Sequence, residues 1–114
     1  MAMTEGWKNQ ALDASVTVIT HIALLDETDT ELSGGSYARK AVTWAAASGG
    51  IVRPNADIEF DVPASTTVSK IAYYSALTDG TKYGEDDVTN EVFANAGTYT
   101  LLAASTGIQL SDPT

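Results

Sequence analysis

The segment Asp57-Ile58-Glu59-Phe60-Asp61-Val62 shows the clearest alternation of apolar and acidic residues in the chain. Successive side chains of an extended strand point to opposite faces, so Ile58, Phe60 and Val62 share one face and the three carboxylates share the other. A strand with one apolar and one charged face is typical of an antiparallel sheet whose outer face contacts water. Pro63 would end the strand, because proline cannot donate a hydrogen bond to a neighbouring strand. The segment therefore indicates an antiparallel β protein.

Similar short runs on both sides of this segment extend the pattern. They are rich in β-branched or aromatic residues and are bounded by turn-forming residues. We expect further strands at 16–25, 37–46, 66–77, 91–94, 98–103 and 108–110, with loops at 26–35 and 84–87. Asp79-Gly80 is a hairpin signal, which places Tyr83 on the returning strand. About eight short strands without alternating helices predict an all-β fold, an antiparallel β-sandwich of the jelly-roll-like kind.

The N-terminal residues differ from this β pattern. Thr4 can cap a short N-terminal helix that continues to Ser15, and Trp7 and Leu12 lie on the apolar stripe of that helix. A helix of this length is marginally stable alone, so it must dock on another surface to persist. We therefore expect a helical docking segment at 1–15 and a β-sandwich domain at 16–114.

The composition excludes several kinds of function. The 114 residues include 15 acidic and 6 basic ones, and the formal net charge of −9 repels nucleic-acid phosphates. The absence of cysteine excludes disulfides, cysteine-ligated zinc and thiol catalysis. No apolar run approaches the ~18 residues of a membrane-spanning helix. Neither a nucleic acid nor a membrane is therefore an expected partner.

No motif for catalysis is present in the sequence. The one histidine, His21, stands in a predicted strand without a recognisable nucleophile partner, and no glycine-rich phosphate loop opens a helix. The acidic stretches 26–31 and 85–87 could offer oxygen ligands to Ca²⁺, but they lack the spacing of a calcium-binding loop. Solvated loops are the simpler interpretation, with a Ca²⁺ site as the open alternative. We expect no catalytic, cofactor-binding or metal-binding residue.

Aromatic residues identify the candidate contact positions. Tyr73 and Tyr74 are adjacent in a predicted strand, so one of them must leave the core. Tyrosine is enriched at protein interfaces, and the outward one then meets solvent, a ligand or a neighbouring subunit. Together with the docking residues of the helix, the candidate interface residues are Trp7, Leu12, Tyr73 and Tyr74. An exposed Trp44 beside polar loops would instead favour a sugar-binding surface.

Five stretches of the chain follow one another in a recognisable order: Lys8–Ala14, Ile19–Leu24, Gly34–Trp44, Phe60–Val68 and Ala94–Leu101. Together they resemble a family of bacteriophage virion proteins, the tail-fibre-like or minor tail proteins. The resemblance implies a non-enzymatic structural protein of the virion that binds other virion proteins, namely tail or capsid subunits, and needs no cofactor. Two alternatives stay open, a capsid (head) decoration protein and a carbohydrate- or receptor-binding module for host attachment. A homo-oligomer, a trimer in particular, is expected at a symmetric site of a particle.

Overall fold

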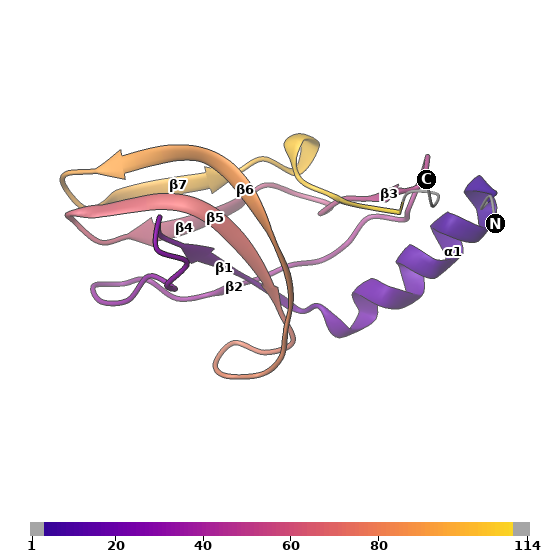
Figure 1. The fold of residues 1–114 in the computed structure, drawn as a ribbon, viewed down its shortest axis with the longest axis horizontal. Coiled ribbons are helices and arrows are strands. Elements are labelled where there is room, and N and C mark those ends of the chain that lie inside the picture. Colours follow the sequence, from indigo (N-terminus) through magenta and orange to yellow (C-terminus); the bar gives the residue numbers. More distant parts are fainter. Residues whose placement is uncertain (1–3, 111–114) are drawn as a thin grey trace.

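Residues 4–110 are described by a computed structural model, in which one α-helix precedes eight strands (Figure 1). The helix is α1 (Glu5–Ser15), and the strands are β1 (His21–Leu25), β2 (Lys40–Ala41), β3 (Ile51–Val52), β4 (Ile58–Val62), β5 (Thr66–Tyr74), β6 (Lys82–Phe93), β7 (Gly97–Leu101) and β8 (Ile108–Gln109). Two short 3₁₀ turns, Val16–Val18 and Ala103–Ser105, follow α1 and β7. The mostly β architecture with an N-terminal helix agrees with the sequence prediction.

The strands pair in antiparallel fashion and are divided among three small sheets. One sheet has the strand order β2-β1-β5-β6, while β4 pairs with β7 and β3 pairs with β8. Within residues 4–110 these sheets make neither a closed sandwich nor a jelly roll. A second full sheet is missing because β2, β3 and β8 contain only two residues each. The antiparallel β fold is therefore confirmed at this coarser level.

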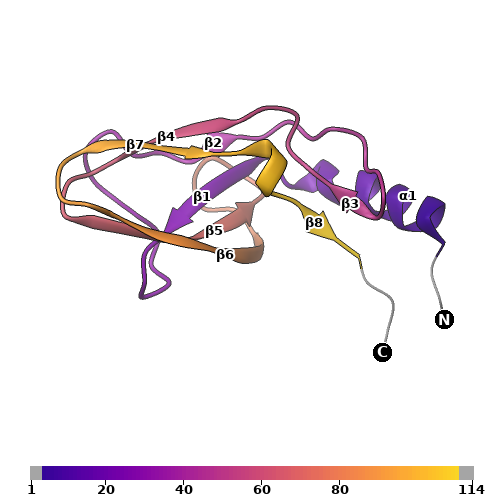
Figure 2. The same cartoon turned by 90° about the horizontal axis from the view of Figure 1, so that it is seen from above.

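The core lies between the four-stranded sheet and the β4–β7 pair. Seen from above, β4 and β7 run along one side of the molecule and β5 and β6 along the other (Figure 2). Both sides contribute to one buried apolar cluster, which includes Ile22, Leu24, Phe60, Val62, Val68, Ile71, Tyr73 and Leu101. Burial of apolar surface, at ~25 cal/mol per Å², is the main force that holds the two layers together.

Strand β4 has the alternation that the sequence predicts. Phe60 and Val62 are buried and Ile58 is half-buried, whereas Glu59 and Asp61 are exposed. The strand pairs with β7 along its whole length. The period-two pattern therefore identified both the strand and its buried face.

The buried face changes within β5 where its pairing with β6 is irregular. The register with β6 shifts between Val68 and Lys70. Val68 pairs with Glu91 and Lys70 pairs with Asp87, so the two extra residues of this irregularity lie on β6, between positions 87 and 91. Val68, Ile71 and Tyr73 all join the main core, although simple alternation puts Val68 on the face opposite to the other two. Simple alternation therefore assigns Val68 to the wrong face, since an irregularity in strand pairing leaves no mark in an apolar pattern.

The connection between β5 and β6 contains the predicted hairpin turn. Asp79 and Gly80 both have left-handed backbone conformations, with φ of 55° and 73°. A Cβ atom at Gly80 would lie only 2.7 Å from Ser75 Oγ, which is too close, so the space at this position also favours glycine. Leu77, which was expected in the strand, lies in this connection and is exposed.

Three other predicted boundaries were wrong. Residues 16–18 form a 3₁₀ turn and not a strand, because the helical hydrogen bonding of α1 continues as one tighter turn. The predicted strand 37–46 is reduced to the two residues of β2. The predicted loop 84–87 is instead extended and joins the first three residues of the predicted strand 91–94 in the single strand β6. Lys70 and Lys82 both form ion pairs with Glu85 of this run.

Candidate interaction surfaces

Helix α1 occupies one end of an elongated molecule, whose principal extents are 47 × 25 × 22 Å (Figure 1). Thr4 is its N-cap as predicted, and the Thr4 Oγ1 atom accepts a hydrogen bond from the Trp7 amide at 3.2 Å. Leu12 is 2% exposed and packs in the main core of the chain. Trp7 is 50% exposed. The two predicted docking residues thus separate, since Leu12 fixes the helix to its own chain and Trp7 faces outward.

Polar side chains of α1 hold the segment that precedes β3. Asp13 Oδ1 accepts a hydrogen bond from the Ala47 amide at 2.8 Å. In the same way, Glu5 Oε1 and Asn9 Oδ1 each accept one at 3.0 Å from the amides of residues 49 and 50. These three bonds and the buried Leu12 fix the direction of the helix.

Tyr73 and Tyr74 point to opposite faces of β5, as the sequence requires. Tyr73 is 3% exposed, lies in the main core and donates a hydrogen bond to Asp86 Oδ2 at 2.6 Å. Burial and this acceptor both raise the pKa of the Tyr73 phenol. Tyr74 is half-buried on the other face, where the Arg39 guanidinium carbon lies 3.6 Å from its ring centre. Tyr74 is therefore the residue that leaves the main core, and a side chain of the same chain covers it.

The guanidinium of Arg39 joins two loops on this outer face. Arg39 Nε and Nη2 donate to the two carboxylate oxygens of Glu31 at 3.0 and 2.9 Å, which is a bidentate pair. The third nitrogen, Nη1, donates to the carbonyl oxygens of Ala76 and Asp79 at 3.0 and 2.7 Å. One side chain thus ties the 26–39 segment to the β5–β6 connection, although the sequence gives no signal for this pairing.

Glu31 is also held by Tyr37. The Tyr37 hydroxyl donates to Glu31 Oε2 at 2.8 Å and accepts from the Leu24 amide at 3.0 Å. Burial raises the pKa of the Glu31 carboxyl, but the hydrogen bonds from Arg39 and Tyr37 outweigh this effect and hold the pKa below its ordinary value of 4.5. The ionised carboxylate is therefore the form that the folded protein favours.

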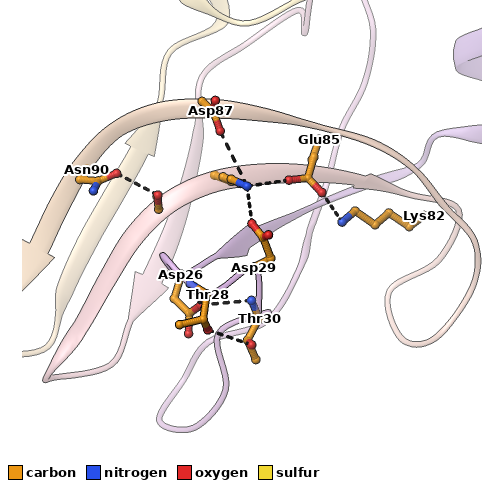
Figure 3. A network of polar contacts seen from close by, with 10 residues as sticks. Asp26, Thr28, Asp29, Thr30, Lys82, Glu85, Asp87 and Asn90 are labelled. Carbon is orange, nitrogen blue, oxygen red and sulfur yellow. Dashed lines mark hydrogen bonds and ion pairs between the residues drawn. The ribbon is translucent and has the colours of Figure 1, made fainter.

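The acidic stretches of the sequence meet at a lysine. Carboxylates of Asp29, Glu85 and Asp87 converge from the 26–31 loop and from β6 (Figure 3). Lys70 Nζ pairs with Asp29, lies 3.2 Å from Glu85 Oε2 and 4.0 Å from Asp87 Oδ1. Lys82 Nζ contacts Glu85 Oε1 at 2.6 Å. Side-chain ammonium groups thus supply the positive charge at this position, where the sequence left a Ca²⁺ site as an alternative.

Reactive groups do not gather elsewhere in residues 4–110. In this part of the chain there is no group of three or more His, Asp or Glu side chains that could hold a metal ion. His21 is half-buried with Nδ1 2.9 Å from Thr20 Oγ1. The Trp44 indole donates to the Ile19 carbonyl at 2.9 Å, and its ring packs 6.1 Å from that of Tyr73. No helix among the described residues is long and apolar enough to span a membrane.

Residues 4–110 form a mostly β protein with an N-terminal helix. The model of a protein family described as Podophage GP4 fiber I protein gp80 matches residues 25–109. Since the match covers most of the chain, the chain belongs to this family: it is a non-enzymatic component of a phage tail fibre and part of the virion. Comparison with curated proteins and with solved structures gives no significant match. The predicted resemblance is confirmed, and the fibre family sets aside the alternative of head decoration.

Proposed function

We propose that this fibre component attaches to its neighbour in the virion through the end of the molecule that carries α1, with Trp7 as the central contact. Of the four candidate interface residues, Leu12 and Tyr73 are buried within the chain and Tyr74 is covered by Arg39. Trp7 is half exposed on a helix that three polar bonds and Leu12 hold in place. A rigidly presented tryptophan loses little conformational entropy on binding, which is why tryptophan is common among residues that dominate interfaces.

The position of α1 relative to the sheets supports the same proposal. The four-stranded sheet and the β4–β7 pair stack as an incomplete sandwich of residues 16–110, and α1 lies beyond one end of it. On this proposal, residues 1–15 are the docking segment. Leu110 N donates to the Gly50 carbonyl at 3.2 Å, and Asn9 of α1 binds the Gly50 amide, so the last described residue lies at the same end. An elongated module held by one end exposes the rest of its length, as a fibre element requires.

Trp7→Ala is expected to reduce incorporation into virions without unfolding the chain. Truncating a tryptophan at the centre of an interface typically costs ~2 kcal/mol or more of binding free energy, which is roughly a 30-fold loss of affinity. The thermal midpoint of the free protein should stay near that of the wild type, because the side chain is half exposed. Occupancy in purified particles, measured by quantitative mass spectrometry, checks the result.

The matched control for this variant is Leu77→Ala. Leu77 is 52% exposed, close to the value for Trp7, but lies in the β5–β6 connection. It should leave incorporation unchanged. Normal occupancy of Trp7→Ala particles would contradict the proposal. Deletion of residues 1–15 is a harsher test, since it also removes Leu12 from the core.

We further propose that the chain forms a homo-oligomer, and specifically a trimer, in the fibre. Fibre attachment sites with threefold symmetry would bring three α1 ends together around an axis. Native mass spectrometry of the purified protein is expected to show a species with three times the 11.9 kDa mass of the chain. A monomer that persists at high concentration would show this proposal to be wrong, while leaving the Trp7 contact to be judged from the particles.

A further inference from the structure

Two strand edges remain unpaired on the same side of the molecule. Strand β6 pairs only with β5, and β7 pairs only with β4, so within residues 4–110 the other edge of each strand has no partner strand. In Figure 1 both strands run along the upper margin, and Figure 2 shows them in different layers. The incomplete sandwich is thus open between β6 and β7.

A groove of about 450 Å³ separates these two edges. One wall is residues 87–91 of β6. The other is formed by residues 99–101 of β7 and by Leu102, Ser105 and Thr106, which follow it. Its lining includes apolar core residues, since Leu101 is 5% exposed and Val88 packs against the main core. An extended edge with unpaired amide and carbonyl groups beside an apolar floor is a template for an added strand.

The charges along the groove select the kind of strand that fits. Glu91 makes no ion pair with the residues that the structure describes. Burial raises the pKa of Tyr99 on the opposite wall, and the negative charge of Glu91 raises it further. Asp87 has a side chain that is 87% exposed, and its one ion pair within residues 4–110 is the contact with Lys70 at 4.0 Å. The groove therefore presents one carboxylate, that of Glu91, without an ion pair among the described residues and one, that of Asp87, with a single long ion pair, which favours a basic segment.

We propose that the groove between β6 and β7 binds an extended segment of another virion protein, with lysine or arginine alternating with apolar residues, as an added strand on β6. Positions 87–91 are the stretch in which β6 carries two extra residues relative to β5, so the added strand would follow an edge that turns toward the groove there. Alternate side chains would then reach the apolar floor at Val88 and Leu101, and those between them the carboxylates of Asp87 and Glu91. The added strand would complete the layer that the chain leaves open.

A second copy of the chain fits this groove poorly. Strand β6 contains four carboxylates and one lysine, and the whole chain has a formal net charge of −9. Pairing two such edges would set like charges opposite each other, which destabilises a strand pair. The proposal rests on the membership of the fibre family and is independent of the contact proposed for Trp7.

Cysteine labelling in assembled particles tests the proposal. The chain has no cysteine, so Thr89→Cys places a single thiol on the β6 wall, and Thr78→Cys places a matched one in the exposed β5–β6 connection. We expect a maleimide to label both variants equally in the free protein. In virions, labelling at position 89 should fall at least fivefold, while labelling at position 78 stays unchanged. Equal labelling of position 89 in the free protein and in virions would overturn the proposal.

Cross-linking from the same thiol identifies the occupant. A reagent that joins the thiol to nearby amines should yield adducts with a lysine-containing segment of a different virion protein. Adducts that contain only peptides of this chain, from a second copy, would overturn the assignment. Both readouts use particles that have incorporated the variant, so a failure of the Trp7 contact is seen separately as lost occupancy.

A synthetic peptide of alternating lysine and valine tests the charge preference in solution. We expect it to bind the free protein, as measured by fluorescence anisotropy, and to bind Glu91→Lys roughly tenfold more weakly. Glu59→Lys makes the same change in net charge on the exposed face of β4 and should bind nearly as the wild type does. If both variants lose affinity equally, only net charge matters, and the groove proposal fails.

Discussion

Phe60→Ala is expected to lower the free energy of unfolding by about 3–5 kcal/mol, a large part of the total for a domain of this size. Phe60 is fully buried in the cluster that joins β4 to the four-stranded sheet. Its removal loses apolar contact on both layers and leaves a cavity that short strands cannot close by a small shift. Urea unfolding followed by circular dichroism measures the change.

Glu59→Ala is the control for this prediction, because Glu59 precedes Phe60 on the same strand and is exposed. It should change the free energy of unfolding by at most about 0.5 kcal/mol. A similar loss for both variants would mean that strand propensity, and not packing between the layers, stabilises β4. A loss of less than about 1 kcal/mol for Phe60→Ala would show that the two layers do not share one core.

Arg39→Met is expected to destabilise the protein by about 2–3 kcal/mol. The side chains of Arg39 and Glu31 are 9% and 28% exposed, so the loss lies below the range for fully buried pairs. The variant leaves the Glu31 carboxylate with only the Tyr37 hydroxyl as a donor, and it frees the carbonyls of Ala76 and Asp79. Thermal unfolding measures the loss, and Arg39→Lys should restore only part of it, because lysine cannot form the bidentate pair.

Lys40→Met removes a positive charge from the next residue and serves as the control. Lys40 makes no ion pair with the residues that the structure describes, so this variant should remain within about 0.5 kcal/mol of the wild type. Equal effects of the two substitutions would show that Arg39 stabilises the protein only through its charge, and not through its hydrogen bonds.

The pH dependence of stability gives a second readout for the same pair. The pKa of Glu31 is lower in the folded chain than its ordinary value of 4.5, so its stabilising contribution is present above that value. The contribution is lost as the pH falls through the folded pKa, when the carboxylate takes up a proton. Wild-type protein should therefore lose more stability between about pH 7 and about pH 3 than Arg39→Met does. An identical loss would mean that Arg39 does not lower the pKa of Glu31.

The contacts of Arg39 and of Lys70 explain a feature of the outer face of the four-stranded sheet. Ala23, Leu25 and Ala72 are buried there, in a small cluster separate from the main core, with Tyr74 packed against them. Charged side chains, those of Arg39 and Lys70, run over this face and bind carboxylates from the 26–31 loop. Ion pairs thus tie the loop to this face of the sheet, while residues 27–30 stay exposed to solvent.

Much of the local structure could be predicted from the sequence because each signal lies within a few neighbouring residues. The alternation at 58–62 identified β4 and its buried face, and Thr4 identified the start of α1. Asp79-Gly80 identified a hairpin turn. The adjacent Tyr73 and Tyr74 had to point to opposite faces in any strand. The resemblance to phage fibre proteins likewise rested on residue order alone.

Only the tertiary structure decided which strands pair, where the pairing of β5 with β6 is irregular and which side chains are left for other proteins. Arg39 meets the carbonyl of Asp79, forty positions away, and no local pattern marks such a pair. The acidic run 85–87 lies in a strand, where Lys70 and Lys82 both form ion pairs with Glu85. Leu12 and Trp7 share one amphipathic stripe in the sequence, yet one is buried and the other is exposed. Local preferences fix the shape of a segment, but burial and charge pairing depend on which distant segments it meets.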